Sequence, residues 1–245
     1  MQRRDLIITT ILFLLFWQLL AMLVHRDILP TPLQVVIAIV TQFGALAAHF
    51  IASALRVIVS VIIAICLAVP AGLAMGQMPR LNRIFAPIAY ILYPIPKIVF
   101  LPIVLLFFGA TDFSKVLMIV LILFFQILVP VRDDAASIRP EILNSVKSLG
   151  AGRRALFRFV YLPASIPAVL TAVRLSIGTA VAVLYITETT ATVLGLGYYI
   201  FLNASTLFDF PATYAGAAAM GFLGLVLYFF IDWLERRLCP WKYAT

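Results

Sequence analysis

Apolar residues fill most of this chain in long uninterrupted runs, and short polar or basic segments separate the runs. A helix needs about 20 residues to cross a bilayer, whose core offers the backbone no hydrogen-bonding partners. Six runs reach or approach that length: residues 6–24, 51–76, 84–108, 114–131, 164–187 and 213–235. They are too continuous for the alternating strands of a membrane barrel. The pattern predicts an all-α membrane protein, a bundle of about six transmembrane helices.

Basic residues gather in every second connection between these runs. Arginines and lysines precede the first run, follow the sixth, and lie between the second and third and between the fourth and fifth. The opposite connections hold only Arg26 and Lys115. Because basic loops remain on the cytoplasmic side, we expect both termini and residues 132–163 to face the cytoplasm. The first run exceeds the usual signal-peptide core of about 7–15 residues, so we interpret it as a retained helix.

The runs divide the chain into three expected parts. Residues 1–50 form a transmembrane helix and a Pro-bounded amphipathic piece at the interface, residues 51–235 form the membrane core, and residues 236–245 form a basic tail. Residues 188–212 combine glycines, polar residues and aromatics, which favours a partly inserted segment over a full crossing.

Composition agrees with a membrane protein and argues against catalysis. The chain is 64% hydrophobic and only 11% charged, whereas soluble domains carry about 25% charged residues. Its two cysteines and two histidines lack metal-ligand spacing, and no paired carboxylates or nucleophile-base pair suggests an enzyme. No phosphate-binding loop occurs. We therefore expect no catalytic residue, metal site or nucleic-acid partner, and any ATP would be bound by another chain.

The connection at 132–163 contains a short amphipathic helix. Pro140 suits a helix start and Gly150 a helix end. Glu141 in the first turn and Lys147 near the last both favour the helix dipole. One helical face carries the apolar residues Ile142, Val146 and Leu149, with Leu143 at its edge. An apolar face in the cytoplasm suggests a partner groove.

A second amphipathic helix is expected after the glycine hinge. It places Arg154 and Arg158 on one face, and Pro163 opens the fifth membrane helix. An alternative is that the basic residues rest on anionic lipid. That alternative accounts for Arg153, Arg154 and Arg158 but not for the apolar face of the preceding helix.

The spacing in this connection resembles the cytoplasmic signature of permease subunits of bacterial ATP-binding-cassette (ABC) importers. That signature reads Glu-Ala-Ala, three residues, Gly, nine residues, Ile, one residue and Leu-Pro. Here the corresponding positions are Asn144-Ser145-Val146, Gly150, Val160 and Leu162-Pro163. The spacing matches, whereas the triplet departs from the pattern. Further stretches resemble the branch that imports nitrate, sulfonates, taurine, bicarbonate and some thiamine precursors: residues 29–36, 52–76, 93–119, 148–180 and 232–241.

The resemblance implies a type I importer fold and a mechanism. The helix at 140–149 would dock into a separate ATPase subunit, which binds ATP and magnesium, so this chain itself holds no cofactor. A periplasmic binding protein would deliver a small anionic solute, and a second copy of the chain would complete the path in the bacterial inner membrane. A different second permease subunit is an alternative. The departure at Asn144 removes one charged contact expected with the ATPase.

Three ionisable residues are candidates for the translocation path because charges inside a membrane normally face protein or a water-filled cavity. Lys97 follows two prolines, Arg174 lies deep in the fifth run, and Glu188 ends it. The structural alternatives are that Lys97 extends to the interface and that Arg174 pairs with Glu188 or with carbonyls. A self-contained secondary transporter or channel is the main functional alternative, although no repeat between halves is evident.

Overall fold

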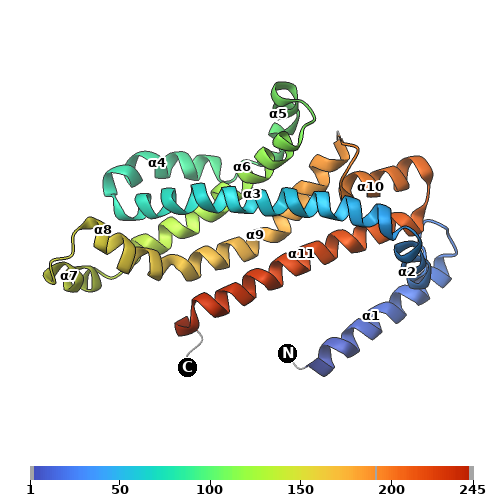
Figure 1. Cartoon of the computed structure of the whole chain (residues 1–245), viewed down its shortest axis with the longest axis horizontal. Helices are drawn as coiled ribbons and strands as arrows, with labels where there is room; N and C mark the ends of the chain where they lie inside the picture. The colour runs from blue at the N-terminus through green and yellow to red at the C-terminus, as the bar shows by residue number, and fades with distance from the viewer. Residues whose placement is uncertain (1–2, 191, 243–245) are drawn as a thin grey trace. The chain divides into compact units, whose positions relative to one another are not determined.

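The computed structural model describes residues 3–190 and 192–242, and every regular element within them is helical. Figure 1 shows their order. The N-terminal half contains α1 (Arg3–Val24), α2 (Pro32–Thr41), α3 (Phe43–Gln77), α4 (Pro79–Leu92), η1 (Lys97–Phe100), α5 (Leu101–Phe108) and α6 (Asp112–Ala136). The C-terminal half contains α7 (Pro140–Ser148), α8 (Arg153–Leu156), η2 (Phe157–Tyr161), α9 (Leu162–Thr190), α10 (Leu196–Leu202), η3 (Asn203–Leu207), α11 (Phe210–Leu238) and η4 (Pro240–Lys242). The all-α prediction is confirmed.

Five helices of the described chain are long and apolar enough to cross a membrane, and a sixth crossing requires a bent pair to count as one span. The bent pair is α4 with η1 and α5, which meet at 83°. The helical run predicted at 84–108 is therefore bent and broken in the structure. Pro94 and Pro96 interrupt it because proline lacks an amide hydrogen and disfavours a helical residue before it.

The connection after α1 is more helical than the sequence suggested. Thr31 and Gln34 form a reciprocal capping box at the start of α2, with the Thr31 amide donating to Gln34 Oε1 at 2.8 Å. Helix α3 begins at Phe43 and runs for 35 residues, or about 52 Å at 1.5 Å per residue. It extends well beyond the predicted run at 51–76.

The chain forms two compact units, one of which combines the N-terminal helices with Glu188–Leu223. In this unit Val35 and Ala38 of α2 pack against Ala215 of α11. Trp17 of α1 packs against the same cluster and donates from its indole nitrogen to the carbonyl of Pro30 at 3.0 Å. Trp17 is thus a packing residue of this unit. Helix α10 has seven residues, too few to cross a bilayer.

The other unit contains Leu55–Thr187 and the C-terminal part of α11. Its centre is the contact between α3 and α6, where Gly72 and Gly76 allow close approach. A Cβ at Gly76 would lie 2.7 Å from the Arg132 carbonyl oxygen, and a Cβ at Gly72 would lie 2.9 Å from the carbonyl oxygen of Leu128. Small residues let membrane helices pack backbone to backbone. The division into 1–50, 51–235 and 236–245 stays a prediction.

Candidate coupling surface and buried polar sites

Helix α7 is the predicted amphipathic helix, and its apolar face is uncovered in the chain. It runs from Pro140 to Ser148, with Glu141 in its first turn and Lys147 in its last, and none of its residues is buried. Ile142 is 49% exposed, and Leu149, just after the helix, is 86% exposed. Gly150 follows with φ of 85°, a value that favours glycine. The geometry presents an apolar face for a partner without distorting the helix.

The second half of the connection differs from the prediction. Helix α8, the π-helical turn η2 and α9 follow one another without a break, so that Arg154–Thr190 forms one apolar helical stretch of 37 residues. Pro163 therefore lies inside this stretch and does not open it. The π-helical turn η2 directly precedes Leu162 and Pro163, and a local π adjustment of this kind accommodates a proline inside a membrane helix. The Arg153 side chain lies outside the described part of the structure.

The Lys97 ammonium group binds backbone carbonyls at the break between α4 and η1. It donates to the carbonyl oxygens of Leu92, Tyr93 and Ile95 at 2.8, 3.1 and 3.3 Å. The group also lies 4.7 Å from the centroid of the Phe125 ring. Lys97 is buried within the chain, and the alternative of a side chain extended to the interface stays a prediction. A cation at the C-terminal end of α4 is favoured by the helix dipole.

Lys97 also lines a cavity of about 340 Å³ between the α4–η1 break, α6 and α9. Two further polar side chains line it: the amide of Gln126 donates to the Thr179 hydroxyl at 3.3 Å. The Gln126 Oε1 atom is buried and has no hydrogen-bond partner among the described residues. A buried acceptor without a partner is costly.

Arg174 pairs with two acids of α11. Its guanidinium lies 2.5 Å from Asp232 Oδ1 and 3.1 Å from Glu235 Oε2. Glu235 is fully buried and also accepts from the Thr171 hydroxyl at 3.1 Å and from the Lys242 ammonium at 2.6 Å. The suggested pair with Glu188 is therefore wrong. The network links α9, α11 and the C-terminal turn η4.

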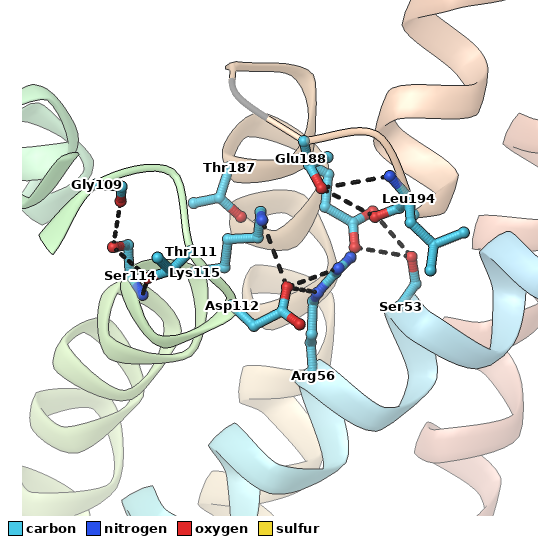
Figure 2. Close-up of polar contacts among 12 residues, drawn as sticks. Ser53, Arg56, Gly109, Thr111, Asp112, Ser114, Lys115, Thr187, Glu188 and Leu194 are labelled. Atoms are coloured by element: carbon cyan, nitrogen blue, oxygen red, sulfur yellow. Dashed lines mark hydrogen bonds and ion pairs between the residues drawn. The ribbon is translucent and has the colours of Figure 1, made fainter.

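Glu188 anchors the turn that precedes α10. Its buried carboxylate accepts from the Ser53 hydroxyl at 2.8 Å (Figure 2). It also accepts from the Gly197 amide at 2.9 Å. The Ser53 oxygen in turn accepts from the Leu196 amide at 2.8 Å, and His49 Nδ1 accepts from the Gly195 amide at 3.0 Å. A Cβ at Gly195 would overlap the Glu188 carboxylate. The glycines thus serve a tight turn.

Tyr199 forms a second polar link in the same unit. Its hydroxyl lies 2.5 Å from Gln42 Oε1, and the Gln42 amide donates to Asp209 Oδ2 at 3.1 Å. Burial, followed by the negative charge of Asp209, raises the pKa of the Tyr199 phenol. The phenol therefore remains a neutral donor at physiological pH.

Arg56 is held by a partner that the sequence reasoning missed. Its guanidinium lies 2.7 Å from Asp112 Oδ1, and the Lys115 ammonium lies 3.5 Å from the same oxygen (Figure 2). Asp112 occupies the first turn of α6, where a carboxylate is favoured by the helix dipole. The sequence signal for this pair was an acid at the start of one apolar run, Asp112, together with an arginine inside another, Arg56.

Comparison with known proteins places the chain in a transporter family. It is 29% identical over 239 residues to the taurine transport permease TauC of Escherichia coli, covering 94% of this chain and 86% of that one. It is 28% identical to the formylaminopyrimidine permease ThiX of Halalkalibacterium halodurans (95% and 93% covered) and 26% identical to the putative aliphatic sulfonates permease SsuC of Bacillus subtilis (92% and 83%).

The fold has a counterpart among solved structures. A chain of the inward-facing MetNI methionine ABC transporter matches with a TM-score of 0.70 at 17% identity, covering 81% of this chain and 98% of that one. The model of the family described as "Binding-protein-dependent transport system inner membrane component" matches residues 64–240. The chain belongs to this family and is a multi-pass, non-catalytic inner-membrane permease subunit of an ABC importer.

Proposed function

We propose that α7 is the element through which a separate ATPase subunit drives this permease. Family membership implies an ATPase and a binding protein as partners. The exposed apolar residues Ile142 and Leu149 support docking because a bound helix gains stability by burying such a face in a groove. The full contact surface comprises Glu141, Ile142, Leu143, Asn144, Ser145, Val146, Lys147, Leu149, Gly150, Arg153, Arg154, Leu162 and Pro163.

The proposal extends to assembly and orientation. Two copies of the chain enclose the path, since closed two-fold assemblies are the commonest. Both termini and α7 face the cytoplasm, where the ATPase binds ATP and magnesium, and this chain holds no cofactor. A binding protein delivers the solute from the periplasm.

Replacing Leu149 with Asp tests the docking. Because Leu149 is 86% exposed, the change leaves packing within the chain intact but places a charge in the partner groove. We expect loss of co-purification with the partner ATPase subunit, with normal membrane insertion. The matched control is Val193→Asp, since Val193 is an 81% exposed aliphatic residue outside the proposed surface. Equal ATPase recovery for both variants would contradict the proposal.

We propose that the solute is a small anion or zwitterion that passes the cavity at Lys97. The relatives named for taurine and sulfonates support this class, as does the Lys97 cation that lines the cavity. An aminosulfonate carries the matching negative group. The similarly related formylaminopyrimidine permease favours a second candidate, an uncharged pyrimidine. Calorimetric titration of the partner binding protein with taurine, an alkanesulfonate and formylaminopyrimidine separates the two classes.

A further inference from the structure

A second hollow, lined by cations, lies beside the coupling connection. It has a volume of about 950 Å³ and is bounded by the α3–α4 turn, α7 and the α8–η2 segment. Arg80, Lys147 and Arg154 line it, and none of its lining residues is acidic. Three cations converging without an acid repel one another. The arrangement favours an anionic occupant.

Two neutral features of the hollow also suit an anion. Gln77 contributes a polar side chain to the lining of the hollow. The hollow also contains the start of α4, where Met78 supplies no side-chain cap. Uncapped amides and the positive end of the helix dipole stabilise phosphate oxygens. A phosphate group would thus satisfy donors that the chain leaves unsatisfied.

An apolar slot adjoins the hollow, and Leu81 lines both. The slot has a volume of about 350 Å³ and lies between α3, α4 and α6. Ala74, Phe85, Ile88 and Phe124 are among its lining side chains, and it exposes almost no polar surface. A free phosphate or an acidic peptide would leave this slot unfilled. An acyl chain would fill it while its headgroup remained among the cations.

We propose that the hollow and the slot together bind one anionic phospholipid, with its phosphate near Arg80 and an acyl chain in the slot. Basic pockets at the cytoplasmic ends of membrane helices recognise such headgroups. Placing the hollow at the cytoplasmic leaflet depends on the proposed orientation of α7. The lipid would brace the α3–α4 turn against the connection that carries α7.

Native mass spectrometry of the purified permease, titrated with phosphatidylglycerol or phosphatidylcholine of equal chain length, tests the proposal. We expect preferential retention of phosphatidylglycerol and about fivefold weaker retention in Arg80→Gln, the effect of one basic residue near an anionic headgroup. Arg83→Gln is the matched control because Arg83 is an exposed arginine of α4 that does not line the hollow. It should change retention less than twofold.

Competition separates a lipid from a free anion without altering the protein. Inorganic phosphate and a short-chain phosphatidylglycerol should displace the long-chain lipid poorly, because neither fills the slot. Equal retention of the two lipid classes, equal effects of the two arginine variants, or efficient displacement by phosphate would each overturn the proposal. The measurement uses the permease alone, whereas ATPase recovery tests α7, so either proposal can fail while the other stands.

Discussion

The turn at Gly195 offers the sharpest test of the buried network around Glu188. Gly195 adopts φ of 141°, and a Cβ there would overlap the carboxylate of Glu188. That carboxylate has no room to withdraw because it is fully buried and bound by Ser53 and by the Gly197 amide. Gly195→Ala therefore combines a strained backbone with a clash against an anchored group.

The expected cost follows from these two effects. A non-glycine residue in such a backbone region costs about 1–3 kcal/mol, and insertion of a methyl group into a filled site costs about 1–3 kcal/mol. Together they predict a loss of about 2–6 kcal/mol in the free energy of unfolding. Gly44→Ala is the control because a Cβ at Gly44, within α3, meets nothing within 4 Å. Alanine there should stabilise the helix by about 0.5–1 kcal/mol.

SDS-driven unfolding in mixed micelles measures both variants on one scale. The reasoning requires Gly195→Ala to unfold at a clearly lower SDS fraction than the unsubstituted chain, and Gly44→Ala at the same or a higher fraction. A difference between the variants below about 0.5 kcal/mol, the scatter expected for a neutral surface change, would show that the turn is neither strained nor tightly packed against Glu188.

Two further predictions concern the other buried charges. Lys97→Gln keeps a donor for the carbonyls of the α4–η1 break but removes the charge, so uptake of an anionic solute into proteoliposomes should fall while ATPase co-purification is unchanged; unchanged uptake would exclude Lys97 from the path. Glu235→Ala leaves Arg174 with one partner and should cost about 3–5 kcal/mol of stability in the same SDS assay. Arg236→Ala, which alters an exposed pair with Asp232, should cost under about 1 kcal/mol, and equal losses would contradict a special role for Glu235.

Signals within a short stretch of sequence predicted helix α7 well. They did not predict ion pairs between residues far apart in the sequence. The apolar spacing of α7, its proline start and its glycine end are all encoded within about a dozen residues, so the helix was identified almost to its last residue. The partners of Arg174 lie 58 and 61 positions away in α11. No periodicity connects them, and the nearer-looking acid at Glu188 misled the prediction.

The break in the third hydrophobic run, residues 84–108, could be predicted only in part from the sequence. Pro94 and Pro96 lie within this run, but nothing in the sequence indicated that its halves would bend by 83°. The size of a bend depends on what satisfies the freed carbonyls. Here the Lys97 ammonium group donates hydrogen bonds to those carbonyls. The sequence analysis proposed Lys97 as a pathway residue and did not predict this structural role.

The three carbonyl contacts of the Lys97 ammonium group limit how it could interact with an anion in the proposed path. An ammonium group has three donors, and the three carbonyls of Leu92, Tyr93 and Ile95 engage it. A solute in the cavity would therefore feel the charge without receiving a hydrogen bond, unless it displaced a carbonyl. That interaction is weaker than a charge-assisted hydrogen bond, and conduction requires binding weak enough for release. If Lys97 lies on the path as proposed, we expect it to lower the barrier for anions through its charge alone, with tight recognition made by the binding protein.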